Sequence, residues 1–359
     1  MHLEARFEDI VDLAALERRW RALEEEAAPA SFFLRWTWMG CWLAALENAQ
    51  ISLPRLLCIA DANGRDVALV LIGRGHAARK LGKVPALWFN ESGHDFGDRP
   101  YIEYNGLLCG EAHKPAAIHS LYDAVADQQE WRVFHISGVE FGSRLPHVPN
   151  IRRTILRDAS PAYFVNLEKV RNAEGDYLSL LSSNTRSQIR RSLKEEPDEL
   201  EIARADDAVT LDLWLEDMAR LNTGRHEDNA WDNAFFRDFA QRIAHAGLAD
   251  GTVELLRIGG AGELPLGYLL NFLWAGRAMN YQSAFAQPRS NKSKPGLMCH
   301  VAAVGRYADA GLSLYSLLAG KDRYKQSLST GAEELNWWAL ERFDWRLESE
   351  ALLRRLLKR

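Results

Sequence analysis

The sequence has few cysteines, no long apolar run and no marked excess of one charge. Its four cysteines among 359 residues lie far apart and form no CxxC pair, so we expect reduced thiols in a cytoplasmic protein. The sequence has no stretch of about 18 apolar residues, so we predict no membrane-spanning helix. The acidic first residues do not suit a signal peptide. A net charge of −5 argues against DNA binding and restricts any nucleic-acid contact to a local basic patch.

Several catalytic motifs are also missing. The chain has no Walker A loop, and no GxGxxG follows a strand at its basic loop, so neither common nucleotide-binding fingerprint is predicted. There is no GxSxG nucleophile motif. The loop "NESGHDFGD" (90–98) is rich in acids and histidine, but without an HExxH or comparable ligand pattern we predict no metal site.

What is present suits a two-domain globular protein. The length exceeds one ordinary core, and the apolar fraction of 47% and charged fraction of 26% are typical of such chains. Twelve tryptophans are more than usual. They would serve core and interface packing, or line a pocket for a large substrate.

The two halves show the same order of predicted elements. In the first half we expect helices at 8–26, 31–46 and 114–128, and strands at 55–60, 66–74, 84–89, 101–108 and 131–137. In the second half we expect helices at 173–195, 206–221, 232–247 and 296–310, and strands at 253–258, 265–274, 277–285 and 312–318. This order predicts an internal duplication, an α+β (α/β) fold with mixed, mostly antiparallel sheets, and a boundary near 150–170.

A basic loop precedes the apolar helix of the second half. The loop "AQPRSNKSK" (286–294) follows a strand, and Pro295 and Gly296 then open the helix. Free N–H groups at a helix start attract phosphate, and basic side chains strengthen that attraction. The pattern suits a pyrophosphate, and equally a solvated basic loop before an ordinary helix.

Three segments carry a resemblance to a known family: "LSSNTRSQIRRSLK" (181–194), "PGLMCHVAAVGRYADAGLSLYSLLAGKDRYK" (295–325) and, more weakly, "SFFLRWTWMGCWL" (31–43). The chain resembles the GNAT superfamily of N-acetyltransferases, and within it the FemAB-like and cellulose-biosynthesis acetyltransferases. The resemblance implies two tandem GNAT-like acyl-CoA N-acyltransferase domains. Residues 1–160 would form a degenerate domain on the acceptor side, and 161–359 an acyl-CoA-binding, catalytic domain, with the acceptor in a cleft between them.

One position departs from the family pattern. An Asp-Phe pair is common where this sequence has Ser316-Leu317. If that aspartate positions the substrate amine, its role is absent here or has moved to Asp322.

The resemblance implies direct attack of an amine on a bound acyl thioester, with no covalent enzyme intermediate. The donor would be acetyl-CoA or another acyl-CoA, and the acceptor a small amine such as an amino sugar, an amino acid or a surface-polymer precursor. Two alternatives stay open: an aminoacyl-tRNA-dependent FemAB-like peptidyl transferase, and a non-catalytic binding module on the same fold.

The candidate catalytic residues are Tyr324, Asp322 and Tyr281. Tyr324 would protonate the leaving thiolate, Asp322 would orient the amine or act as base, and Tyr281 would face the thioester. Each also has an ordinary structural interpretation: helix packing, a turn and the core. The candidate donor-binding residues come from the basic loop, the helix start and the later basic turn: Arg289, Asn291, Lys292, Lys294, Pro295, Gly296 and Lys325.

The candidate substrate-binding residues lie in three polar segments. They are Arg186, Arg190, His226, Glu91 and His94. Arg186 and Arg190 share one face of a predicted basic helix that would serve the donor, an anionic acceptor, tRNA phosphates or only solvent. The segment 345–359 predicts an amphipathic basic helix that packs on the fold, with a peripheral membrane contact left open.

Overall fold

The computed structural model describes residues 3–27, 30–140, 145, 148–196, 200–225, 229–260 and 265–357. The chain divides into two units: Met1–Ala159 with Leu335–Arg359, and Ser160–Glu334. The C-terminal residues, which the sequence analysis placed in the second domain, therefore group with the first unit. None of the described helices is long and apolar enough to cross a membrane.

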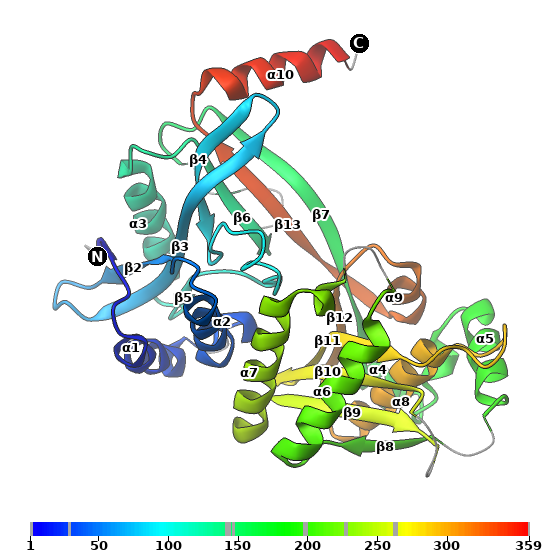
Figure 1. Ribbon diagram of the computed structural model, residues 1–359. Coiled ribbons are helices and arrows are strands. Elements are labelled where there is room, and N and C mark those ends of the chain that lie inside the picture. Colours follow the sequence, from blue (N-terminus) through cyan, green and yellow to red (C-terminus); the bar gives the residue numbers. More distant parts are fainter. Residues whose placement is uncertain are drawn as a thin grey trace. The chain divides into compact units, whose positions relative to one another are not determined.

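Unit 1 holds a mixed sheet with helices on its faces (Figure 1). Its elements are β1 (Glu4–Glu8), α1 (Leu13–Glu26), α2 (Trp36–Asn48), β2 (Arg55–Ala60), β3 (Asp66–Arg79), β4 (Gly82–Phe89), β5 (Leu108–Cys109), α3 (Lys114–Asp127), β6 (Val133–Val139), most of β13 (Gly331–Glu341) and α10 (Trp345–Leu357). The strand order is β1-β2-β3-β4-β6-β13, and the pair β4–β6 is parallel while the other neighbours are antiparallel.

Unit 2 repeats this arrangement. Its elements are the end of β7 (Arg153–Asn166), α4 (Leu167–Asn172), α5 (Ser183–Leu193), β8 (Glu201–Arg204), α6 (Ala208–Asn222), α7 (Ala234–Asp250), β9 (Val253–Gly259), β10 (Gly267–Trp274), β11 (Arg277–Phe285), α8 (Pro295–Asp309), β12 (Leu314–Ala319) and α9 (Arg323–Leu328). The strand order is β8-β9-β10-β11-β12-β7, again with one parallel pair, β11–β12.

The last strand of each sheet comes from the other half of the chain. β7 follows β6 in sequence but pairs with β12 in unit 2. β13 follows α9 but pairs with β6 in unit 1. This exchange explains why residues 335–359 belong to unit 1.

Each sheet has an apolar core on both faces. In unit 2, α4, α5 and α8 pack on one face through residues such as Ile189, Met298 and Tyr307. The aromatic side chains of α7, among them Phe236 and Phe239, cover the other face. Most tryptophans serve packing. Trp20, Trp42 and Trp131 are buried and each donates its indole N–H to a backbone carbonyl: Leu34, Gly97 and Val125, respectively.

The sequence-based elements differ from the structure in several places. The strand expected at 101–108 is wrong, because only Leu108–Cys109 form a strand there, paired with β3, and Asn105 makes an isolated bridge to Val139. The single helix expected at 173–195 is split into a 3₁₀ turn (Tyr177–Leu180) and α5, and Gly175 precedes that turn with φ of +81°. The strands β1, β7, β8 and β13 and the helix α9 were not expected.

Candidate functional site

The parallel strands β11 and β12 pair over a short length only. Their register joins Arg277–Met279 to Leu314–Ser316, and all residues of both strands are described. Beyond those pairs the two strands are no longer paired with each other. An unpaired strand edge exposes backbone N–H and C=O groups that can bind an extended ligand.

A β-bulge lies at this opening. β10 pairs Leu270 with Gln282 and Asn271 with Asn280, so Tyr281 is the extra residue of β11. A bulge bends its strand and redirects the neighbouring backbone groups, and bulges are frequent next to active sites. The ring of Tyr281 stacks on Phe272 with centroids 4.7 Å apart and contacts Phe236 and Phe239 of α7. Tyr281 therefore faces the α7 side of the sheet.

Beyond the bulge, β11 turns backbone groups toward the open edge. Ala286 donates its N–H to Leu266 at the β10 edge. Because successive residues point to alternate edges, Ser283 and Phe285 face the other way. Their carbonyls accept hydrogen bonds from Asn222 Nδ2 at 3.1 Å and from the Arg225 guanidinium, respectively. Asn222 is the last residue of α6 and Arg225 lies just after it, so the end of α6 borders the opening.

The basic loop 286–294 is fixed by α5. Ser192 Oγ, on a fully buried residue of α5, accepts from the N–H of Lys294 at 2.6 Å. Ser290 Oγ donates to Glu195 at 3.1 Å, and Arg289 Nη1 lies 3.4 Å from Glu196 Oε2. The structure therefore brings the predicted basic helix and the predicted phosphate loop together.

The cationic side chains of this region differ in whether they form an ion pair. Arg289 has Glu196 as a partner, whereas Lys292, Lys294 and Arg190 are exposed and form no ion pair with any described residue. Arg186 is half-buried and likewise forms no such pair. Asn291 is exposed in the same loop. Pro295 starts α8, and no side chain caps the helix. A side chain at Gly296 would lie 3.1 Å from the Phe285 ring, so glycine allows the helix start to approach β11.

A cavity of about 400 Å³ adjoins the loop. Its lining combines loop residues with the start of β10 and the end of α6, including Arg289, Ser293 and Tyr268. Tyr268 donates its hydroxyl to Asp217 Oδ2 at 2.6 Å, which fixes the wall that α6 contributes. The lining also has apolar residues such as Leu221 and Pro265, and its two arginines, Arg220 and Arg289, are paired with Asp217 and Glu196.

His300 of α8 lies in an aromatic cluster beside the opening. The residue is 1% exposed, its Nδ1 lies 2.8 Å from Tyr315 Oη, and its ring stacks on Tyr324 at 5.8 Å and meets Phe285 edge-on. No described residue is a hydrogen-bond partner of its Nε2. Burial, with a smaller effect of Lys325, lowers the pKa of His300 to about 3, so the imidazole is neutral. In the sequence, only its position four residues after Gly296 indicates that His300 lies near the start of this helix and so near the opening.

Tyr324, Asp322 and Lys325 meet at the turn after β12. Lys325 Nζ donates to the Ala319 carbonyl at 2.7 Å, and a side chain at Gly320 would collide with that Nζ. Leu318 precedes the turn with φ of +58°, an uncommon conformation for a non-glycine residue that is frequent at functional sites. Partial burial and the Asp322 carboxylate raise the pKa of Tyr324, which is 39% exposed. Tyr324 thus keeps its proton at neutral pH.

The corresponding opening of unit 1 is filled. β4 and β6 pair in parallel over Ala86–Trp88 and Val133–His135. Beyond that point Asn105 Nδ2 donates to Phe89 O at 2.9 Å and to Ser137 O at 3.0 Å, and so bridges the two strands. An extended ligand cannot enter between strands that a buried amide already joins.

The loop after β4 holds Glu91 and His94. Ser137 Oγ donates to Glu91 at 2.7 Å, and burial followed by the nearby Asp98 carboxylate raises the pKa of Glu91 to about 8. Asp98 accepts from Ser92 and from the Gly93 N–H, while His94 is exposed. Among the described residues no group of three His, Cys, Asp or Glu side chains has the geometry of a metal site. His226 lies outside the described residues.

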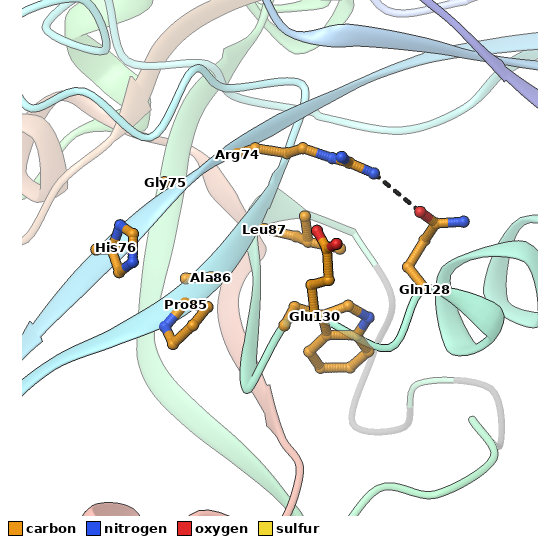
Figure 2. Close-up of a pocket in the computed structure, with 9 residues that line it drawn as sticks. Arg74, Gly75, His76, Pro85, Ala86, Leu87, Gln128 and Glu130 are labelled. Carbon is orange, nitrogen blue, oxygen red and sulfur yellow. Dashed lines mark hydrogen bonds between the residues drawn. The ribbon is translucent and has the colours of Figure 1, made fainter.

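Unit 1 has a cavity of its own, also of about 400 Å³ (Figure 2). Arg74, hydrogen-bonded to Gln128 at 2.9 Å, and Glu130 bring opposite charges to a lining that also contains Leu87 and Trp131. Such a lining suits a ligand that carries both charges. No predicted site residue lies in it.

Comparisons with known proteins agree with this architecture. Residues 183–326, from α5 to α9, match the family model of the acetyltransferase (GNAT) domain. A search of curated protein sequences finds no match. Among solved structures, FemX has a TM-score of 0.54 and 10% identity, covering 97% of this chain and 99% of that chain.

Two further structures have similar scores. L-PGS from Bacillus licheniformis has a TM-score of 0.56 and 11% identity, covering 95% of this chain and 97% of that one. A conserved protein of unknown function from Bacteroides thetaiotaomicron has a TM-score of 0.57 and 13% identity, with coverages of 94% and 100%. Identities this low show the fold alone. Over residues 183–326 this chain therefore matches the GNAT acetyltransferase domain, and over nearly its whole length it shares the fold of FemX.

Proposed function

We propose that this protein transfers an acyl group from acyl-CoA to an amine, by direct attack in a complex that holds both substrates. The observation that supports this most is the opened ladder between β11 and β12, which lies in the GNAT domain beside a cationic loop and an uncapped helix start. The site offers each part of an acyl-CoA a chemically matched surface.

The donor would bind in three places. The pyrophosphate contacts Lys292, Lys294 and the first N–H groups of α8, because cations and a helix N-terminus both stabilise phosphate. The pantetheine arm runs along the open edge of β11 and binds backbone groups there that Asn222 and Arg225 do not occupy, as an added strand does. The thioester then lies at the bulge near Tyr281, where redirected N–H groups polarise its carbonyl.

The chemistry needs one proton donor and one proton acceptor. The amine nitrogen attacks the thioester carbon, a C–N bond forms, the C–S bond breaks and the thiolate leaves. Tyr324 gives the thiolate its proton, and Asp322, in the same turn, orients the amine and receives the proton that the amine releases. The acceptor is a small amine, and Glu91 and His94 stay predictions for its binding.

Calorimetric titration with acetyl-CoA and longer acyl-CoAs tests the donor site. Each charge-assisted contact contributes about 1.5–3 kcal/mol, so the change of Lys292 and Lys294 to Ala should weaken binding by about tenfold or more for each lysine. The control is Lys169→Ala, an exposed lysine of α4 in the same unit. The proposal is refuted if no acyl-CoA binds, or if the double variant binds as well as the control.

One observation favours aminoacyl-tRNA as the donor instead. The exposed cations of α5 and the loop, which include Arg190, Arg191, Lys292 and Lys294, form a longer basic surface than one pyrophosphate requires. Binding of tRNA that weakens steeply with salt, together with no binding of acyl-CoA, would support this donor.

A further inference from the structure

The C-terminal helix α10 has its apolar side turned to solvent. Leu352, Leu353 and Leu356 are 59%, 45% and 59% exposed, and Trp345 at the start of the helix is 59% exposed. At 100° per residue these four side chains fall on one side of the helix. A surface helix of a globular protein normally turns this side to the core.

The opposite side of α10 holds the helix on unit 1, mainly by polar contacts. Glu350 is buried and accepts the N–H of Lys80, in the turn between β3 and β4, at 2.6 Å. Leu347 is the apolar anchor, packed with Val84, Ala86 and other residues of the sheet. Figure 1 shows α10 across the end of the β3–β4 hairpin. The exposed leucines therefore contribute nothing to this attachment.

The apolar surface is larger than the helix alone. Phe343, just before α10, is 69% exposed, and Leu81 in the adjoining turn is 39% exposed. We call the exposed side chains of Leu81, Phe343, Trp345, Leu352, Leu353 and Leu356 the α10 face. Apolar side chains gathered in this way on a surface mark an interaction site.

Among the described residues around the α10 face, the acids are paired and the unpaired charges are positive. Glu341, Asp344, Glu348 and Glu350, the four acids of 341–357, each have an arginine partner within 4.0 Å. Lys80, Lys83 and Arg355 are exposed and form no ion pair with any described residue. The exposed charge is thus cationic on a chain whose net charge is −5. A second copy of this chain would bring the same cations against these, whereas an anionic lipid surface complements them.

We propose that the α10 face docks the protein on an anionic lipid surface. The leucines and Trp345 enter the boundary between headgroups and acyl chains, and the flanking lysines and Arg355 contact lipid phosphates. Docking places unit 1 against the lipid and needs neither acyl-CoA nor catalysis, so it can fail or succeed independently of the proposed reaction.

Sedimentation of the full chain with vesicles tests the proposal. One set contains equal amounts of phosphatidylglycerol and phosphatidylcholine, and the other phosphatidylcholine alone. We expect binding to the anionic vesicles, weaker binding at high salt, and a loss of about tenfold or more for the double variant Leu352→Gln, Leu356→Gln.

The matched control is Val209→Gln, Leu213→Gln, since these residues of α6 are 70% and 57% exposed. All four positions are at the surface, so both variants should fold. No binding to anionic vesicles, or equal loss in both double variants, overturns the proposal. So does a solution dimer, seen by light scattering, that the α10 substitutions dissociate while vesicle binding is absent.

Discussion

Because of His300, the free energy of unfolding of unit 2 should fall at acid pH. The folded protein keeps this imidazole neutral down to about pH 3, because it is buried beside Tyr315 and Tyr324. The unfolded chain takes up a proton below the ordinary histidine pKa of about 6.5. Below that pH the unfolded state binds more protons, so the free energy of unfolding falls as the pH falls.

The size of the effect follows from the same two values. At pH 4.5, two units below the unfolded pKa and still above the folded one, the loss is about 2–3 kcal/mol relative to neutral pH. The variant His300→Gln cannot take up this proton. It should be less stable at pH 7, because the contact with Tyr315 is altered, but it should lose about 2–3 kcal/mol less than wild type between pH 7 and 4.5.

Urea unfolding at the two pH values measures this difference. The control is His119→Gln, because the His119 side chain is 79% exposed on α3 and pairs only with Asp123 among the described residues. Nuclear magnetic resonance of labelled imidazoles gives a second readout, in which the His300 signal should not titrate above pH 4. Equal losses of stability in wild type and His300→Gln, or titration of His300 near pH 6, would refute the reasoning.

Two further predictions concern proton positions. Tyr324→Phe should lower kcat about a hundredfold or more while the Kd for acyl-CoA stays unchanged, because the hydroxyl of this 39% exposed residue donates a proton in the transition state and the ring that packs on His300 is kept. Steady-state release of free thiol measures this, and an unchanged kcat contradicts it. The raised pKa of Glu91, about 8, means that the folded state holds a proton that the unfolded state releases above its lower pKa. Stability should therefore fall as the pH rises from about 5 to 8, by at most about 1.4 kcal/mol per pH unit, in wild type and in Asp95→Asn. Glu91→Gln should show a flatter dependence in urea unfolding, and an unchanged slope would contradict the assignment.

The sequence predicts elements well where the determining signals are local. The strand 55–60 was expected with its observed bounds because an Asn-Gly turn and a second apolar run follow it at once. The strand 277–285 likewise matches β11, after the two-residue turn at Ala275 and Gly276. Hairpin neighbours are close in sequence, so turn chemistry and apolar runs suffice to place them.

The missed strands pair with distant partners. β7 contains Pro161 and several charged residues, so its segment was interpreted as the boundary between the two halves. β13 has two glutamates near its start, at 333 and 334, and it pairs with β6, which lies almost two hundred residues earlier. No local pattern shows which sheet such a strand will join.

The candidate site shows the same division. The loop 286–294 could be found because its lysines stand next to a helix start in the sequence. The position of His300 could not, since its neighbours Phe285, Tyr315 and Tyr324 come from three elements that only the fold brings together. An apolar helix with one histidine is ordinarily a core helix. Only the position of His300 beside the opening between β11 and β12 makes it a candidate site residue.

The duplication itself explains why one unit is the better candidate for donor binding. Both sheets contain a parallel pair that separates after three residues, β4–β6 and β11–β12. In unit 1 the buried side chain of Asn105 joins the separated strands, and its oxygen accepts from Asn90 and Gly106. In unit 2 the equivalent edge is bordered by Asn222 and Arg225, whose side chains donate to β11 carbonyls. Among the described residues, neither side chain forms a hydrogen bond with β12. We infer that the shared topology supplied two openings, and that the loop after β4 closed one of them while the loop after β11 acquired the cations that an acyl-CoA needs.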